Sequence, residues 1–196
     1  MNELNNSDTP LKYFIEVYKN KIPSNICDDI INEIDDDNWQ KHTWYDLNKN
    51  TFLSEQSNEL DVMGASPQIY KKIHYYFENC VKQYNQKFSF ESEKTKFIVN
   101  KISSIRLNRY SITQCMRQHH DHIHALFDGD EKGIPVISII ANLNDDYDGG
   151  QLYFWSDFTL NLSKGDIIIF PSNFMYPHGV KEVVSGKRYS AVAWSW

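Results

Sequence analysis

Cysteine is scarce in this chain of 196 residues, and the three that occur, Cys27, Cys80 and Cys115, form no CxxC pair. We therefore expect reduced thiols rather than a disulfide framework or a cysteine-based zinc site. No apolar run approaches the roughly 20 residues that a membrane-spanning helix requires, so no membrane partner is expected. The first residues, MNELNNSDTP, lack the basic start and the apolar stretch of a secretory signal. We accordingly expect a cytoplasmic protein.

Positive charge is also in short supply. The chain has 20 Lys and Arg residues against 26 Asp and Glu residues, which gives a formal net charge of -6. Such a surface repels a phosphate backbone, so nucleic acid is not an expected partner. Hydrophobic residues make up 41% and charged residues 23% of the chain, as in an ordinary globular protein. At about 150 residues per domain, we expect a flexible N-terminal segment over residues 1–10 and a single domain over residues 11–196.

The period of the hydrophobic residues changes along the chain. Apolar residues recur at helical spacing over residues 24–34 and again over about 66–87, after a short strand-like run at 13–18. From about Phe97 onward the period is two, and turn residues separate the predicted strands 104–110, 136–143, 151–155, 158–162, 166–170 and 188–194. Helices followed by short strands predict an α+β fold, mainly β, in which N-terminal helices flank an antiparallel sandwich or jelly roll.

Four of the seven histidines fall within the segment 118–124, which reads QHHDHIH. Imidazole and carboxylate are ligands that iron(II), manganese and zinc use, and two His with one carboxylate are typical of non-haem iron oxygenases. Residues i and i+2 of a strand point the same way, so His119 and Asp121 can bind one ion while His120 faces away. His178, which follows the apolar run 165–171, is the candidate third ligand.

Arg188 and Ser190 form an i, i+2 pair on the last predicted strand, and both can point into the interior of the fold. An arginine in an apolar interior needs an anion, and its planar fork of N–H donors matches a carboxylate. A metal triad beside such an arginine predicts a small dicarboxylate lying between them.

Residues 100–196 also contain an ordered set of short motifs. These are Tyr110 nine residues before His119, the pair His119-x-Asp121, Leu143-Asn144-Asp145, Gly149-Gly150-Gln151-Leu152, Lys164-Gly165-Asp166 leading to Phe170-Pro171, His178-Gly179-Val180 and Gly186-Lys187-Arg188. Each is weak alone, but the ordered set is specific. It resembles the iron(II)- and 2-oxoglutarate-dependent dioxygenases, in their prolyl 4-hydroxylase-like branch.

The resemblance implies a double-stranded β-helix. Its iron ligands and catalytic centre would be His119, Asp121 and His178. Its candidate cosubstrate-binding residues would be Arg188, Ser190, Tyr110 and Asn142. Arg188 would hold the distal carboxylate of 2-oxoglutarate. Asn142 stands where family members often have a tyrosine that reaches the cosubstrate.

The resemblance further implies an enzyme that uses Fe(II), 2-oxoglutarate and O2, with ascorbate as reductant. It would hydroxylate an unactivated C–H bond and release succinate and CO2. The preferred substrate would be a peptidyl proline, converted to 4-hydroxyproline, so the expected partner is a proline-containing peptide or protein. Another peptide residue or a free amino acid stays open.

Two other interpretations of the histidine cluster are possible. His122-x-His124 with His178 would resemble a cupin-type site, with the acidic ligand offered only loosely by Asp128 or Glu131. The fold could also be a non-catalytic module that holds a structural ion. Closed zinc sites normally have four protein ligands, and three candidates are present, so this interpretation is disfavoured.

Other polar residues near the cluster have less specific predictions. Arg106, Arg109 and Arg117 are expected to pair with the acidic surface in preference to binding substrate. His120, like His122 and His124, is expected to lie in a loop or to face the substrate. The region 37–66 matches no part of the family pattern, and the sequence assigns neither a substrate nor an oligomeric state.

Overall fold

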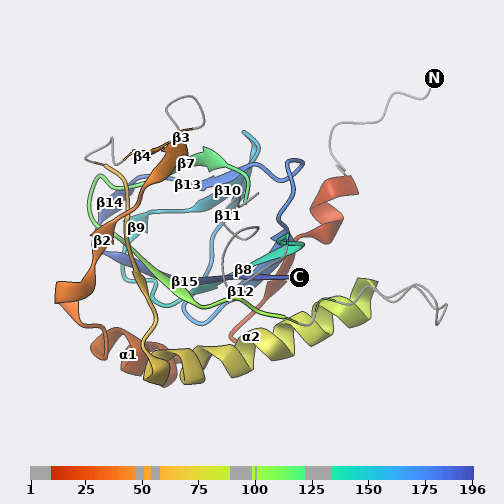
Figure 1. Cartoon of the computed structure of the whole chain (residues 1–196), viewed down its shortest axis with the longest axis horizontal. Helices are drawn as coiled ribbons and strands as arrows, with labels where there is room; N and C mark the ends of the chain where they lie inside the picture. Colours follow the sequence, from red (N-terminus) through yellow and green to blue (C-terminus); the bar gives the residue numbers. More distant parts are fainter. Residues whose placement is uncertain (1–9, 47–50, 54–57, 89–98, 100, 122–133) are drawn as a thin grey trace.

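The structure is a computed structural model that describes residues 10–46, 51–53, 58–88, 99, 101–121 and 134–196. Its helical elements are, in chain order, η1 (Pro10–Phe14), α1 (Ser24–Asn32), η2 (Asp36–Asn38) and α2 (Pro67–Phe88). Both α-helices form where apolar residues recur at helical spacing, and both lie along one side of the strands (Figure 1). Residues 1–9, most of the predicted flexible segment, lie outside the described residues.

The strands form two main sheets. Across the larger sheet the order is β1 (Glu16–Tyr18), β12 (Ile167–Pro171), β8 (Ile137–Asn142), β15 (Arg188–Ser195), β6 (Arg106–Tyr110), β5 (Asp61–Gly64) and β2 (Gln40–Lys41). Across the smaller sheet it is β11 (Phe158–Leu160), β10 (Leu152–Phe154), β13 (His178–Val180) and β7 (Met116–His119). Two further pairs are β9 (Asp148–Gly149) with β14 (Val183–Ser185) and β3 (Trp44–Asp46) with β4 (Thr51–Leu53). Neighbouring strands within the main sheets run antiparallel.

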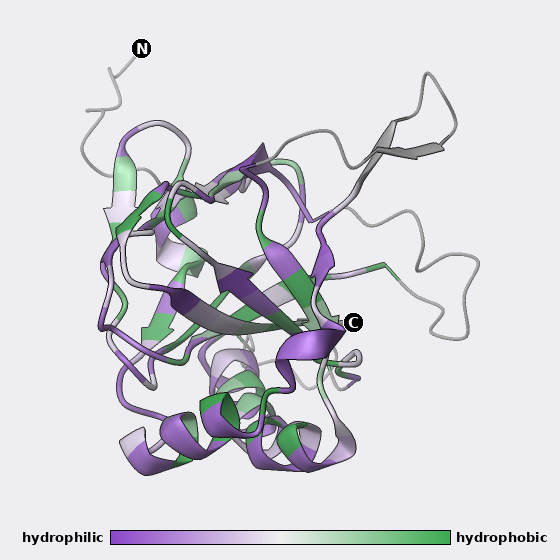
Figure 2. Cartoon of the chain, turned by 90° about the vertical axis from the view of Figure 1, so that its left-hand side faces the viewer, coloured by the Kyte–Doolittle hydropathy of each residue, from purple (hydrophilic) through white to green (hydrophobic). Residues whose placement is uncertain are grey.

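The larger sheet buries apolar side chains on both of its faces. Ile139 of β8 packs toward the helices in one cluster with Phe77 of α2. The next residue, Ile140, packs in a second cluster with Phe154 of β10, which belongs to the smaller sheet. Successive residues of a strand point to opposite faces, so the period of two places one cluster under the helices and the other between the sheets. Figure 2 shows the helices on one side of the strands, with hydrophobic and hydrophilic residues interspersed along them.

The predicted strand at residues 13–18 is wrong in its first half. Glu16–Tyr18 (β1) pairs with β12, whereas Tyr13 and Phe14 belong to η1. The rings of both residues contact Phe88 at the end of α2, with centroids 5.6 and 5.2 Å apart. The docking site on α2 is distant in sequence, so the local pattern could not indicate it.

The strands predicted after residue 104 are all present, with bounds within two residues of those expected. The fold is thus mainly β with two α-helices, as the sequence predicted. In the described part of the chain, no helix combines the length and the apolar character needed to cross a membrane.

Candidate active site

The predicted metal ligands come together in the structure. His119 ends β7 and lies directly opposite His178, the first residue of β13, in the smaller sheet. Asp121 follows β7 by two residues. One ligand atom from each of the three residues lies within 4.8 Å of the others. The Asp121 carboxylate is 3.2 Å from Nε2 of His119 and 3.6 Å from Nε2 of His178. Tertiary pairing of β7 with β13 therefore completes the triad.

Hydrogen bonds to the backbone orient both imidazole rings. Nδ1 of His119 lies 3.0 Å from the carbonyl oxygen of Arg117, and Nδ1 of His178 lies 3.0 Å from that of Tyr176. A carbonyl oxygen only accepts, so each Nδ1 carries the proton and donates it. In this tautomer the Nε2 lone pair of each ring lies on the side of the Asp121 carboxylate, where it can bind a metal.

The ionisation of the triad suits a divalent metal. Burial would raise the pKa of Asp121, but His178, His119 and the hydroxyl of Ser138 outweigh it and hold the pKa well below its ordinary value. Burial lowers the pKa of His178 to about 4, despite the nearby Asp121 carboxylate. At neutral pH the triad thus offers a carboxylate and a neutral imidazole at these two positions, which are the forms that bind Fe(II).

Ser138 and Ser172 support the carboxylate, and sequence reasoning missed both. The Ser138 hydroxyl donates to Oδ2 of Asp121 at 2.6 Å, and its oxygen lies 2.8 Å from the Ser172 hydroxyl. Both serines are buried. Hydrogen bonds of this kind fix the direction of a ligating carboxylate. The sequence offers one signal for Ser138, which is its position on the inward face of β8. It offers none for Ser172, which tertiary structure brings close to Ser138.

Arg188 is a buried cation in the same cavity as the triad. It begins β15, is 2% exposed, and lines this cavity together with Tyr110 and Ser190. Its Nη1 donates to the Ser190 hydroxyl at 3.3 Å, and its guanidinium carbon lies 5.0 Å from the centre of the Tyr110 ring. Its Nε has no hydrogen-bond partner, and no carboxylate among the described residues forms an ion pair with it. An unpaired buried charge is costly, so the site is built for an anion.

Strand register explains why these side chains share the cavity. Arg188 lies opposite Tyr110 and Ser190 opposite Asn108 in the β15–β6 pair. Gly150 makes room beside the arginine, since a Cβ there would lie 3.0 Å from Cδ of Arg188, and its φ of +64° suits glycine. Burial raises the pKa of Tyr110, so its hydroxyl stays protonated and can donate a hydrogen bond.

Asn142 is placed differently from the other predicted cosubstrate residues. Its Nδ2 donates to the carbonyl oxygens of Asn144 and Leu162, at 2.7 and 3.1 Å, and its Oδ1 accepts from the Tyr147 hydroxyl at 3.2 Å. It is not among the residues that line the cavity with the triad. Its amide serves the turn after β8, so the arrangement offers no support for a cosubstrate contact.

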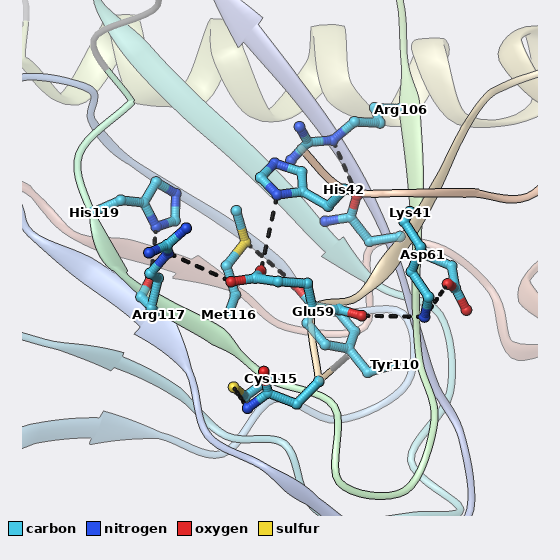
Figure 3. A network of polar contacts seen from close by, with 12 residues as sticks. Lys41, His42, Glu59, Asp61, Arg106, Tyr110, Cys115, Met116, Arg117 and His119 are labelled. Atoms are coloured by element: carbon cyan, nitrogen blue, oxygen red, sulfur yellow. Dashed lines mark hydrogen bonds and ion pairs between the residues drawn. The ribbon is translucent and has the colours of Figure 1, made fainter. Parts of the chain in front are cut away.

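A buried acidic residue lies at the rim of the site, in the region that matched nothing in the sequence. Glu59 is 2% exposed, with Oε1 3.4 Å from Nε of Arg117 and Oε2 3.9 Å from Nδ1 of His42. Burial, followed by nearby positive groups, lowers the pKa of His42 to about 3. Figure 3 shows these residues close to His119 and Met116. The network braces the strand that carries His119.

The remaining histidines of the cluster give less information. His120 is exposed, in agreement with the predicted orientation away from the triad. His122 and His124 lie outside the described residues, as do Asp128 and Glu131. The cupin-type arrangement needs them and is not favoured, because His119 and Asp121 already form the metal-binding group with His178 among the described residues.

Comparison with known proteins finds a family that the C-terminal part of this chain resembles. Residues 105–196 match the model of the 2OG-Fe(II) oxygenase superfamily. The chain is 28% identical over 111 residues to prolyl 4-hydroxylase 1 of Arabidopsis thaliana, a match that covers 46% of this chain and 39% of that protein. It is 36% identical over 76 residues to a PKHD-type hydroxylase of Prochlorococcus marinus (strain MIT 9215), covering 37% and 34%. The matches thus span well under half of these curated relatives.

Solved structures show the same fold. A prolyl hydroxylase from Trichoplax adhaerens, in complex with a peptide of the hypoxia inducible factor oxygen degradation domain, superposes with a TM-score of 0.66 at 15% identity, covering 93% of this chain and 83% of that chain. The viral collagen prolyl hydroxylase of Paramecium Bursaria Chlorella virus-1, in complex with 2OG, gives 0.62 at 15% identity and covers 93% and 94%. The resemblance predicted from the sequence is confirmed: residues 105–196 match the 2OG-Fe(II) oxygenase superfamily, and the curated relatives that the chain resembles include a prolyl 4-hydroxylase.

Proposed function

We propose that the protein is an Fe(II)- and 2-oxoglutarate-dependent dioxygenase that converts a peptidyl proline to 4-hydroxyproline. The observation that carries the proposal is the shared cavity, in which a His-Asp-His triad faces a buried arginine that has no anion of its own. In this proposal the two facing sheets form a double-stranded β-helix. A cupin-type or structural metal site would give Arg188 no role.

Different residues of the site bind the metal and the cosubstrate. His119, Asp121 and His178 hold Fe(II), which when bound supplies the activation of O2 that couples decarboxylation of 2-oxoglutarate to hydroxylation of a C–H bond. Arg188 binds the distal carboxylate through its charged N–H donors, and the Ser190 hydroxyl next to it adds a further donor. Products are succinate, CO2 and the hydroxylated substrate.

Tyr110 and the apolar walls of the cavity orient the cosubstrate and exclude water. The Tyr110 ring underlies the Arg188 guanidinium, and its hydroxyl points toward Sδ of Met116 at 3.7 Å. Leu152 and Val192 line the same cavity. A dry, preorganised pocket strengthens the charge-assisted contacts and prevents loss of the reactive centre to water.

The peptide substrate is proposed from the relatives. The relatives named above are prolyl hydroxylases and a PKHD-type hydroxylase, and the Trichoplax enzyme is in complex with a peptide. We propose a proline-containing peptide or protein as partner, and ascorbate as the reductant that keeps the metal ferrous.

The test is turnover with and without peptide. Purified protein with Fe(II), 2-oxoglutarate and ascorbate should release succinate slowly alone and faster with a productive peptide from a proline-rich library, in which mass spectrometry should find a gain of one oxygen. Asp121→Ala is the matched inactive control. Binding of metal without any effect of 2-oxoglutarate on turnover or calorimetry would overturn the proposal.

A further inference from the structure

A second arginine faces the same cavity from its other end. Arg106 begins β6 and shares its inward parity with Asn108 and Tyr110, and it lines the cavity that contains the triad. Arg106 lies opposite Val192 on β15, whereas Arg188 lies opposite Tyr110. Four residues of strand separate the two positions, or roughly 13 Å at about 3.3 Å per residue. One arginine therefore stands at each end of the pocket.

The guanidinium of Arg106 is held in place but keeps free donors. Its Nε donates to Oδ1 of Asn108 at 3.0 Å, and its guanidinium carbon lies 5.2 Å from the centre of the Trp194 ring. Among the described residues, its terminal nitrogens have no hydrogen bond and no ion pair. This cation–π contact and the hydrogen bond restrict the guanidinium, so its terminal N–H groups are partly preorganised for a ligand.

The neighbouring arginine behaves as the sequence predicted, and Arg106 does not. Arg109 points to the other side of β6 and pairs with Asp36 at 2.8 Å and Asp61 at 3.2 Å. Arg106 was also expected to pair with an acidic surface residue. Its position on β6, an even number of residues from Asn108 and Tyr110, instead directs its side chain into the cavity and away from the acidic surface. The difference comes from which face of β6 each side chain occupies.

Among the described residues, the groups that face Arg106 provide no dedicated anion. Trp194 is uncharged and contacts Arg106 with its ring, and Figure 3 shows Arg106 beside His42, whose low pKa keeps it neutral. Asp121 is the carboxylate that acts on it electrostatically, but Ser138 and the two histidines of the triad already engage that group. Arg106 is partly exposed while Arg188 is enclosed, so Arg106 is the arginine that an incoming substrate can reach.

The net charge of the pocket also favours an anionic group of the substrate. This count rests on the proposed function, because it includes the metal and 2-oxoglutarate. A divalent metal, Arg106 and Arg188 outweigh the single Asp121 carboxylate by three positive charges. Bound 2-oxoglutarate, a dianion, leaves one positive charge at the end of the pocket where Arg106 lies. A partly desolvated charge is stabilised by a counterion, so this end of the pocket favours an anionic group of the substrate.

We propose that Arg106 is a specificity-determining residue that binds a carboxylate of the substrate. The carboxylate comes either from an aspartate or glutamate close to the hydroxylated residue or from the C-terminus of the substrate. Both sources present the same chemistry to the guanidinium, which can bind either one with two parallel hydrogen bonds.

Peptide binding tests the proposal without requiring turnover. The probes are acetylated, amidated hexapeptides that contain one proline and one aspartate at each other position, matched peptides with asparagine, and a set without acidic residues but with a free C-terminus. Their affinity for protein loaded with Mn(II) and 2-oxoglutarate is measured by calorimetry. At least one aspartate peptide, or the free-carboxylate set, should bind about tenfold more tightly than its neutral match, as expected for a charge-assisted contact.

Variants assign that preference to one arginine. Arg106→Gln should remove the preference while its affinity for 2-oxoglutarate stays unchanged, and Arg106→Lys should keep part of it. Arg109→Gln is the matched control, because Arg109 lies next in the chain on the opposite face, and it should keep the full preference. The proposal is overturned by a preference that survives Arg106→Gln, by its absence in the wild type, or by an Arg106→Gln effect confined to 2-oxoglutarate. Failure of the dioxygenase function would show instead in the same peptides with Fe(II) in place of Mn(II), as binding without hydroxylation.

Discussion

The two faces of the larger sheet are built by the same strands and carry different kinds of side chain. On β15, Ala191 and Ala193 pack against the helical layer, while Arg188 and Ser190 point into the cavity between the sheets. The first face is closed by apolar packing, and the second keeps a desolvated cation without a partner carboxylate among the described residues. Both faces bury apolar side chains, but the binding groups lie on the second face, so mutations on the helix-facing side should change stability without changing binding.

The largest effect is expected at the triad, on the cavity side. Asp121→Ala, like replacement of His119 or His178, should abolish iron-dependent succinate release because the metal loses one of three ligands. Circular dichroism should stay near that of the wild type, since the apolar face is untouched. His120→Ala is the control, because His120 is exposed, and it should retain much of the activity. Full activity of Asp121→Ala would contradict the ligand assignment.

The helix-facing side should show the opposite behaviour. Ile139 is fully buried there, and Ile139→Ala leaves a cavity that should lower the free energy of unfolding by about 2–5 kcal/mol. The milder Ile139→Val should cost about 0.5–1.5 kcal/mol. Urea denaturation measures both values. The affinity for 2-oxoglutarate, measured on the folded protein, should not change, and a large change would show that the two faces are coupled.

Arg188→Ala should weaken 2-oxoglutarate binding at least about tenfold, because charge-assisted hydrogen bonds contribute about 1.5–3 kcal/mol each and about 1.4 kcal/mol is one decade. Arg188→Lys should be intermediate, since an ammonium does not reproduce the planar fork. Calorimetry gives the affinities, and metal content should stay near wild type. If Arg188→Ala bound 2-oxoglutarate normally, the cosubstrate assignment would be wrong, and the protein would be supported only as a metal-binding β-sandwich.

The smallest expected effect is a pH dependence that belongs to the cavity side. The pKa of His178 is lowered from 6.5 to about 4 in the folded protein, so the unfolded chain binds its proton first as the pH falls. His178 should therefore contribute a decrease of about 1–2 kcal/mol in the unfolding free energy of the metal-free protein between about pH 7.5 and pH 5. Denaturation at the two pH values tests this. His178→Ala should remove this contribution and leave that of His42, whose pKa is also lowered, and Ile139→Val should leave the whole dependence unchanged.

Local patterns were sufficient for the residues whose roles depend on strand parity. His119 with Asp121, and Arg188 with Ser190, are i, i+2 pairs, and the structure places each pair in the same cavity. The side chain of Asn142 was not predictable in this way. Its position follows from contacts with Leu162 and Tyr147, which only the folded turn after β8 brings within reach.

The sequence by itself determined the alternation of helical and extended segments, the likeness to the 2OG-Fe(II) oxygenases, and the side-chain pairs that share a strand face. These properties depend on spacings of a few residues, which the backbone period converts directly into direction. Tertiary structure alone decided that Ser138 and Ser172 support Asp121, that Glu59 lies beside Arg117, and that Arg106 faces the cavity. Strand pairing and the packing of one sheet on the other bring these groups together, and no local period encodes which face of a strand will be the inner one.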